Sequence, residues 1–282
     1  MPLSESWDRD DARRVIAAAL TEDIGLGDVT SCSVIPADVR FAGVMAARED
    51  LVVAGLDVAG EIFRTVSPAV VWRPRVADGA RVPANTVLAD IEGPARGLLT
   101  AERAALNLLQ HLSGIATLTR VYADRIAGTK AALLDTRKTI PGLRALAKYA
   151  TRVGGARNHR MGLYDAVLIK DNHIAVCGGI AAAVARARAA TSVSVEVECD
   201  TLDQVREAVA AGADTLLFDN MPVEVLREAV AIVGGKARTE ASGGVTLDTI
   251  RNIAETGVDA ISVGRITQSA PAVDIGLDWL AG

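Results

Sequence analysis

The chain has few residues of the types that form covalent or metal anchors. Its 282 residues include only three cysteines, and no lysine occurs before Lys130. The cysteines, Cys32, Cys177 and Cys199, form no Cys-x-x-Cys pair and are odd in number, so the sequence indicates neither a disulfide framework nor a zinc site. We expect all three to be buried small apolar side chains.

Long hydrophobic runs and strong positive charge are also absent. No run of about 18 uncharged apolar residues occurs, and the early segment SESWDRDDARR lacks the basic-then-apolar pattern of a targeting signal. A formal net charge of −5 offers no basic surface for nucleic acid. We therefore expect a cytoplasmic globular enzyme that binds neither a membrane nor nucleic acid.

Common cofactor motifs are missing as well, because neither GxGxxG nor GxxxxGK[ST] occurs. The segment DGARVPANTVLADIEG resembles the turn-rich sheet of biotinyl and lipoyl carrier domains, which suggests a binding module as an alternative. A swinging-arm carrier needs a lysine on its hairpin, and residues 1–129 contain none. We therefore interpret the likeness as one of sheet geometry alone.

The first half of the chain is predicted to combine helices with an antiparallel sheet. A helix is expected in residues 1–24, capped by Ser4 or Ser6, followed by a loop at EDIGLGDVTS. Four short apolar runs, FAGVMAA, LVVAGL, AVVWRPRV and TVLADIEG, indicate strands, with a helix in GLDVAGEIFRTV. A further helix is predicted from Thr100, as its cap, to Tyr122.

Beyond Lys130, apolar strands alternate with alanine-rich helical segments, which is typical of a parallel sheet built from βα units. The six predicted strands are AALLDTR, DAVLIKDNH, VSVEVEC, TLLFDN, ARTEASGG and AISVGR. A β/α barrel is the natural closure. Either the barrel is incomplete or a strand lies undetected in the 138–165 connection, and we favour a barrel with fewer than eight strands.

Polar residues follow each predicted strand at its C-terminal side, where barrel enzymes keep their sites. In chain order they are Arg137 and Lys138, then Lys170, Asp171 and Asn172, then Glu198, then Asp219 and Asn220, then Glu240 with Ser242-Gly243-Gly244, then Gly264 and Arg265. We expect these strand ends to meet at one mouth.

The positive charge is concentrated in one stretch of this acidic chain. Residues 137–170 contain a single acid, Asp165, against His159 and eight lysines or arginines. These eight are Arg137, Lys138, Arg144, Lys148, Arg152, Arg157, Arg160 and Lys170. These charges could instead belong to a solvated basic loop without a ligand. Because Arg137 and Lys170 directly follow predicted strands, we favour a pocket for an anionic ligand.

The last strands predict a phosphate site and a metal site. Ser242-Gly243-Gly244 and Val263-Gly264 each lead from a strand into a helix, where backbone N–H groups bind phosphate. Glu198 and Asp219 end successive strands, and such carboxylates hold Mg²⁺ or accept hydrogen bonds from ribose hydroxyls. Glu196 points the same way as Glu198, and we expect it to form a structural ion pair deeper in the barrel.

Several long motifs resemble one known family. AERAALNLLQHLSGIATLT, DTRKTIPGLRALAKYA, NHRMGLYDAVLIKDNH, and VEVEC followed by LLFDN are similar to quinolinate phosphoribosyltransferases, and the resemblance extends from EDIGLGDVTS to DIGL near the end. It implies an α/β protein with an N-terminal α/β sandwich and an incomplete barrel of seven or fewer strands. The implied domains are 1–112, with the tail 269–282 packed on it, and 113–268.

The resemblance also implies the reaction and the binding site of its first substrate. Members transfer the phosphoribosyl group of phosphoribosyl pyrophosphate (PRPP) to quinolinate with loss of CO₂. The two quinolinate carboxylates are expected to meet Arg137, His159, Arg160 and Lys170. A fifth cation, Arg103, is expected to come from the neighbouring subunit of a homodimer, or of a larger assembly of dimers.

For PRPP the resemblance implies a second set of residues. Lys138 is expected to face the pyrophosphate and, with Lys170, Glu198 and Asp219, to be catalytic, while Glu198 and Asp219 also bind Mg²⁺, directly or through water. The remaining predicted contacts to PRPP come from Thr136, Asn220, Ser242, Gly243, Gly244, Val263, Gly264 and Arg265.

The chain departs from the family pattern in VGRITQSAP, where a small residue is expected in place of Arg265 and a histidine in place of Gln268. Arg265 either contacts the phosphate or points to solvent beside a compensating acid. Arg157 is interpreted as a surface residue and His173 as a hydrogen-bonded structural one. The alternative function is a relative that uses nicotinate or serves a molybdenum-linked process, although nicotinate has one carboxylate for four or five cations.

Overall fold

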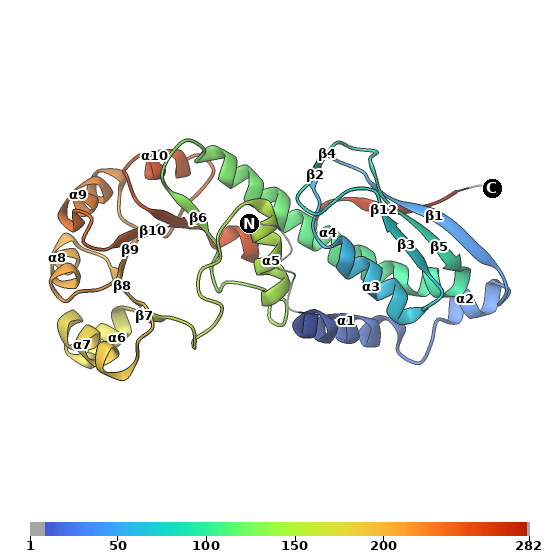
Figure 1. The fold of residues 1–282 in the computed structure, drawn as a ribbon, viewed down its shortest axis with the longest axis horizontal. Helices are drawn as coiled ribbons and strands as arrows, with labels where there is room; N and C mark the ends of the chain where they lie inside the picture. Colours follow the sequence, from blue (N-terminus) through green and yellow to red (C-terminus); the bar gives the residue numbers. More distant parts are fainter. Residues whose placement is uncertain (1–8, 281–282) are drawn as a thin grey trace. The chain divides into compact units, whose positions relative to one another are not determined.

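The computed structural model describes residues 9–280, which form two compact units (Figure 1). The first contains residues up to 120 together with 139–155 and the segment from 266 onward, and the second contains 121–138 and 156–265. The contacts divide the chain at 120/121, and the predicted domain boundary at 112/113 stays a prediction. The contacts also assign residues 139–155 to the first unit, because the helix in this segment packs in the core of that unit.

The first unit contains the antiparallel sheet that the sequence predicts. Its strand order is β12-β1-β5-β3, and a separate pair is formed by β2 and β4. The bounds are β1 Arg40–Ala47, β2 Leu51–Val52, β3 Val71–Pro74, β4 Arg81–Val82, β5 Val87–Pro94 and β12 Ile275–Trp279. Residues of the chain's end thus pair with β1, since Gly276 lies opposite Ala46.

Helices complete the core of the first unit. They are α1 Arg9–Ile24, α2 Val29–Val34, α3 Leu56–Val66, α4 Ala95–Arg125 and α5 Arg144–Gly154, of which α4 continues into the second unit. Asp78 caps α3, since its carboxylate accepts from the N–H groups of Gly55 at 2.7 Å and Leu56 at 3.2 Å. Tyr149 from α5 donates its hydroxyl hydrogen bond to the same carboxylate.

Three local predictions about this unit need comment. The end of the loop expected at EDIGLGDVTS is the start of α2, which begins because Asp28 accepts a hydrogen bond from the N–H of Ser31 at 2.8 Å. Thr100 is not a cap, because α4 already begins at Ala95, and its hydroxyl instead donates to Asp28 at 2.9 Å. The proposed caps Ser4 and Ser6 lie outside the described residues.

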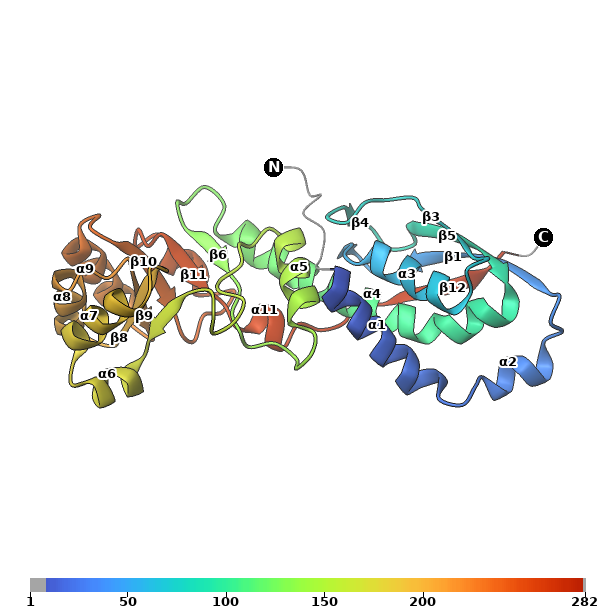
Figure 2. The ribbon, with the colours of Figure 1, turned by 60° about the horizontal axis from the view of Figure 1, so that its bottom comes forward.

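The second unit is a parallel sheet of six strands in the order β6-β11-β10-β9-β8-β7. Its strands are β6 Ala132–Leu134, β7 Val167–Ile169, β8 Val195–Cys199, β9 Thr215–Asp219, β10 Arg238–Ser242 and β11 Ala260–Ser262. Its helices are α6 Asp171–Cys177, α7 Ile180–Ala190, α8 Leu202–Ala210, α9 Val223–Val233 and α10 Ile250–Ala254, while α11 Arg265–Gln268 begins at the last residue of this unit and continues in the first. Helices α7 to α9 line the outside of the strands (Figure 2).

In this order β7 to β11 pair consecutively, and β11 also pairs with β6, as in a β/α barrel. The barrel is open between β6 and β7, which do not pair. At that opening the chain forms one isolated parallel bridge, Leu134 with Arg157. Two backbone hydrogen bonds support it, from Arg157 N–H to Leu133 at 2.8 Å and from Asp135 N–H to Arg157 at 3.2 Å. The predicted incomplete barrel is confirmed, and the 138–165 connection supplies this short extra pairing.

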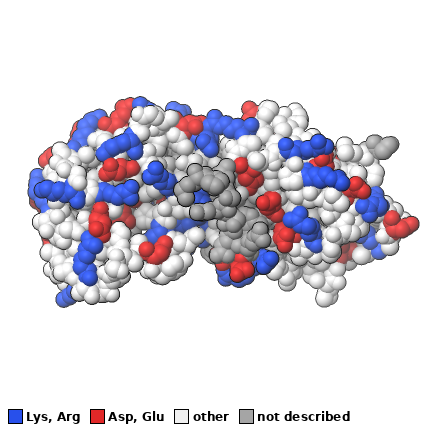
Figure 3. Space-filling view, viewed as in Figure 1, with Lys and Arg blue, Asp and Glu red and all other residues white. Residues whose placement is uncertain are grey.

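Two remaining expectations concern cysteines and membranes. Cys199 is buried as predicted, but Cys177 is half-buried and Cys32 is exposed, so the expectation of three buried thiols is wrong for the last two. Among the described helices, none is both long and apolar enough to span a bilayer. On the face drawn in Figure 3, basic and acidic side chains are interspersed.

Candidate functional site

The parallel register brings polar residues of neighbouring strands together at one end of the second unit. Lys170 follows β7 directly, Glu198 lies in β8, and Asp219 and Ser242 end β9 and β10. Glu198 lies beside Leu217, and Ser242 lies beside Asp219. Because side chains alternate along a strand, Glu198 and Asp219 point to the same face of the sheet.

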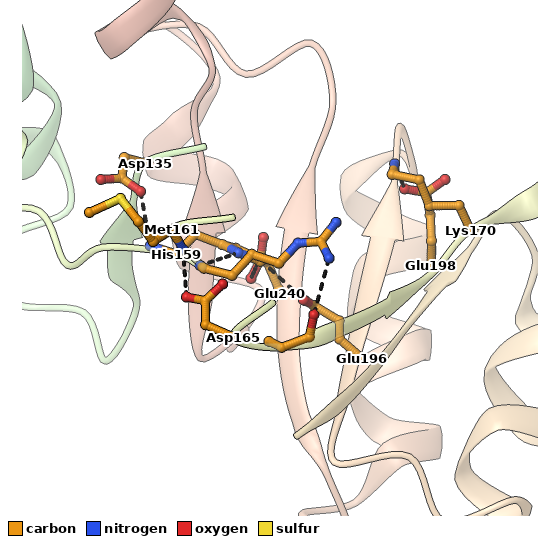
Figure 4. A network of polar contacts seen from close by, with 10 residues as sticks. Asp135, His159, Met161, Asp165, Lys170, Glu196, Glu198 and Glu240 are labelled. Carbon is orange, nitrogen blue, oxygen red and sulfur yellow. Dashed lines mark hydrogen bonds and ion pairs between the residues drawn. The ribbon is translucent and has the colours of Figure 1, made fainter. Parts of the chain in front are cut away.

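Lys170 and Glu198 form an ion pair at this end of the barrel (Figure 4). The lysine side chain is 47% exposed and the glutamate 12% exposed, so the ammonium group faces outward over a mostly buried carboxylate. The backbone N–H of Lys170 donates to Nδ1 of His173 at 2.9 Å. His173 therefore stabilises the start of α6, in line with its predicted structural role.

The ends of β9 and β10 are held together by Asn220. Its backbone N–H donates to Ser242 at 2.9 Å, and its side-chain amide donates to Asp219 at 2.7 Å. Asn220 adopts a positive φ of 53° and Gly243 one of 87°. A Cβ on Gly243 would lie 2.2 Å from Oδ1 of Asn220, so only glycine fits at this turn.

Lys138 lies against the turn that follows β11. A Cβ on Gly264 would lie 3.0 Å from Cδ of Lys138 and 3.8 Å from its Nζ. The hydroxyl of Thr136 accepts a hydrogen bond from the N–H of Lys138 at 3.0 Å, which orders the loop after β6. An ammonium group therefore lies beside the glycine turn in which a phosphate site is predicted.

The two arginines of the predicted carboxylate pocket lie close enough to repel each other. The pKa of the Arg160 guanidinium is lowered, first by burial and then by the positive charge of Arg137. One Arg160 nitrogen donates to the carbonyl of Ala166 at 3.1 Å. Two like charges in a partly buried place are stabilised by an anion between them, and a carboxylate has the matching geometry.

His159, Glu196 and Glu240 form a cluster (Figure 4). Nε2 of His159 is 3.1 Å from Glu196 and 3.5 Å from Glu240, and the Glu240 side chain is only 3% exposed. Burial and the charge of Glu196 raise the pKa of Glu240 to about 7. Glu196 therefore contacts His159 deep in the barrel, where the sequence predicts a structural partner for it.

The sequence places Glu240 among the polar residues at the strand ends but predicts no contact for it. The pattern Arg238-Thr239-Glu240-Ala241-Ser242 also places Glu240 on the same face as Ser242. The three ligand-type atoms of the cluster lie within 4.8 Å of one another, a spacing compatible with a metal ion. The same side chains line a cavity of about 330 Å³ with Arg160 and Arg157.

Two predicted site residues, Arg103 and Arg265, are exposed. Arg103 is an exposed residue of α4 in the first unit. Arg265 is exposed and hydrogen-bonded to Tyr122, whose hydroxyl pKa is raised by burial. Both alternatives for Arg265, a phosphate contact or exposure beside a compensating acid, stay predictions.

A parallel barrel that gathers lysine, arginine and glycine turns at the carboxyl ends of its strands defines an enzyme fold suited to anionic, phosphate-bearing ligands. Family models support a narrower assignment. The model for the N-terminal domain of quinolinate phosphoribosyl transferase matches residues 28–113, and that for the C-terminal domain matches residues 115–278. The chain belongs to the quinolinate phosphoribosyltransferase family.

Individual relatives agree with this assignment. A nicotinate-nucleotide pyrophosphorylase (carboxylating) of Mycobacterium leprae is 46% identical over 278 residues, covering 95% of this chain and 97% of that protein. A solved structure of the nicotinate-nucleotide pyrophosphorylase from Francisella tularensis is similar with a TM-score of 0.93 and 41% identity, covering 99% of this chain and 98% of the other. The likeness therefore includes both units.

Proposed function

We propose that this chain transfers the phosphoribosyl group of PRPP to quinolinate with decarboxylation, giving nicotinate mononucleotide, pyrophosphate and CO₂ in NAD biosynthesis. The observation that carries the proposal is the gathering of charged side chains at neighbouring strand ends, where Lys170 pairs with Glu198 and Asp219 points to the same face as Glu198. Membership of the family and the names of the relatives support the same reaction.

The quinolinate half of the site is assigned to the cations around the opening of the barrel. Arg137 and Arg160 supply planar guanidinium groups that bind a carboxylate through two parallel hydrogen bonds. Lys170 supplies a mobile point charge at the mouth, where it is half-exposed. His159 belongs to the same segment as Arg160. Arg103 completes the set from a second copy of the chain, as the family resemblance implies.

The PRPP half is assigned to Lys138 and to residues at the ends of β8 to β11. Lys138 lies beside Gly264 and faces the pyrophosphate, while the Ser242-Gly243-Gly244 turn receives the 5′-phosphate through its N–H groups. Glu198 and Asp219 point to one face and accept hydrogen bonds from the ribose hydroxyls. Asn220 orients Asp219 through its amide. Thr136, Val263 and Arg265 complete the predicted contacts.

The donor set also fits Mg²⁺, which prefers carboxylate oxygens together with substrate phosphates. Glu198 and Asp219 offer such oxygens on one face of neighbouring strands. Bound there with PRPP, the ion supplies positive charge that stabilises the pyrophosphate as it leaves.

The chemistry needs little covalent work from the protein. Lys138 stabilises the departing pyrophosphate while the pyridine nitrogen of quinolinate attacks C1 of an oxocarbenium-like ribose. The arginines hold the ring so that its nitrogen faces this carbon, and such positioning supplies much of the rate. When the carboxylate beside the nitrogen departs as CO₂, its bonding electron pair stays on that ring carbon, where the positive charge of the new pyridinium stabilises it. A proton from Lys170 or from water completes the product.

Assembly and location are inferred more indirectly. An exposed arginine on α4 suits a site shared between two copies of the chain, so we assign a homodimer with Arg103 acting on the partner's substrate. Three free cysteines suit the reducing cytoplasm.

The deciding experiment offers purified protein PRPP and Mg²⁺ with either quinolinate or nicotinate, and follows pyrophosphate and CO₂ release. Turnover with quinolinate alone establishes the proposed reaction. Turnover only with nicotinate, or with neither substrate, overturns it and returns attention to Arg265 and Gln268, where the chain departs from the expected pattern.

A further inference from the structure

Both ring nitrogens of His159 are engaged by protein atoms. Nδ1 accepts a hydrogen bond from the backbone N–H of Arg160 at 2.7 Å, so Nδ1 carries no proton. The ring proton therefore lies on Nε2, which faces Glu196 at 3.1 Å and Glu240 at 3.5 Å. A substrate carboxylate finds no ring N–H left to accept from.

The backbone around His159 is fixed from a second side by Asp135. One oxygen of this buried carboxylate accepts from the N–H of His159 at 2.9 Å, and the other accepts from the side-chain amide of Asn158. Asp135 directly follows β6, whereas Glu196 and Glu240 belong to β8 and β10. The segment 158–160 is therefore tied to three different strands of the barrel.

Glu240 is buried, although the sequence predicts no contact for it. Its side chain is 3% exposed, and burying a carboxyl group lowers the stability of the fold unless polar partners offset the cost. Its carboxyl group lies 3.5 Å from Nε2 of His159, and Nδ1 of the same imidazole accepts from the backbone N–H of Arg160. Displacing that imidazole displaces the Arg160 backbone as well, because the two are directly bonded.

We propose that Glu240, together with Glu196, is a positioning residue that acts through His159 to place Arg160 for a substrate carboxylate. His159 contributes to quinolinate binding through this contact and not as a cation facing the substrate. The proposal deepens the proposed function and rests on it for the identity of the anion.

The test compares Glu240→Gln with Glu240→Leu. Glutamine keeps an oxygen that accepts from Nε2 of His159, whereas leucine has a similar volume and no acceptor. We expect Glu240→Leu to raise the KM for quinolinate roughly ten- to a hundredfold, since small displacements of binding groups have effects of this order. The KM for PRPP should stay within about twofold of wild type, and Glu240→Gln should restore most quinolinate affinity.

A matched control comes from the residue that precedes Glu240 in β10. Thr239 is also buried, but its hydroxyl bonds to Asp259 at 2.8 Å and not to His159. Thr239→Val should lower the thermal midpoint without separating the two KM values. Equal rises in both KM values for Glu240→Leu, or an unchanged quinolinate KM, would overturn the positioning role.

A second measurement does not depend on turnover. In ¹⁵N NMR of the wild-type protein, His159 should show an unprotonated Nδ1 and a protonated Nε2, and Glu240→Leu should disturb this pattern. If the wild type fails to use quinolinate yet shows this tautomer, the proposed function fails while the contact stands. A doubly protonated His159, or a metal ion bound stoichiometrically to the cluster, overturns the inference.

Discussion

The ammonium group of Lys170 is paired with the carboxylate of Glu198 across the ends of neighbouring strands β7 and β8. One residue is assigned to quinolinate and the other to PRPP, so the pair joins the two halves of the proposed site. A quinolinate carboxylate that binds Lys170 competes with Glu198 for the same charge. Filling one half of the site therefore alters the electrostatics of the other.

This pair predicts opposite effects of two substitutions. Lys170→Met should weaken quinolinate binding by about 1.5 to 3 kcal/mol, the cost of a lost charge-assisted contact. Glu198→Gln should leave quinolinate binding equal or tighter, because the competing charge is gone, while lowering kcat with PRPP. Titration calorimetry with each substrate checks both. Weaker quinolinate binding in Glu198→Gln would contradict the competition.

Gly243→Ala should impair the phosphate half of the site. The new methyl group would collide with Asn220 at 2.2 Å and force a residue with φ of 87° to carry a side chain. We expect a rise of roughly tenfold or more in the KM for PRPP, with the quinolinate KM little changed. Gly212→Ala is the control, since Gly212 also has a positive φ of 78° but no atom lies within 4 Å of its Cβ position.

Subunit mixing tests whether Arg103 acts on the partner's substrate. Arg103→Ala and Lys138→Ala are each expected to be nearly inactive alone. In a mixed dimer, one site carries both defects and the other carries none. Random mixing makes about half of the dimers mixed, so activity should recover to about a quarter of wild type. Activity no higher than that of the parents would place all site residues within one chain.

Asp78→Ala should destabilise the first unit. The substitution removes the cap from the N–H groups of Gly55 and Leu56 and leaves the Tyr149 hydroxyl without its acceptor. We expect a loss of about 1 to 3 kcal/mol in the free energy of unfolding, measured by urea denaturation. Asp57→Ala, an exposed change in the first turn of α3, should cost less than about 0.5 kcal/mol.

Glu240 predicts a pH dependence of stability. Its pKa is about 7 in the folded protein against an ordinary value of 4.5, so the folded state holds a proton that the unfolded state has lost between these pH values. Stability from this group is therefore complete below about pH 4.5 and is lost as pH rises through 7.

The measurement is the thermal midpoint of wild type and Glu240→Gln at pH 5 and pH 8. The variant cannot ionise, so its midpoint should rise relative to that of the wild type as pH increases. Glu224→Gln, an exposed change on α9, should follow the wild type at both pH values. An equal offset at both pH values for Glu240→Gln would contradict the raised pKa.

The fold was largely predictable because it depends on periodicity. The strands of the second unit are apolar runs bounded by polar turns, and all six lie where their sequences place them. Short elements were harder to predict. Helix α2 has only six residues and depends on the single Asp28 cap, while α4 begins five residues before Thr100 because Ala95 already follows β5 directly.

The sequence indicates which residues belong to the candidate site, but not which side chains contact each other there. Strand-end placement identifies Lys170 and Glu198 as neighbours in the site, since parallel strands end at the same edge. The partners of His159 could not be predicted, because Glu196 and Glu240 are distant in sequence and their approach depends on how the barrel curves. Likewise, no pattern in VGRITQSAP indicates that Arg265 bonds to Tyr122.

The bridge between Leu134 and Arg157 gives the barrel one weak seam. Elsewhere neighbouring strands share a ladder, whereas this junction has a single bridge, so local opening should begin here and expose its amides to hydrogen exchange first. Arg160 lies three residues beyond the seam. A ligand that binds Arg160 while this bridge is formed therefore also slows exchange at Asp135 and Arg157, so that substrate binding stabilises the weakest junction of the barrel.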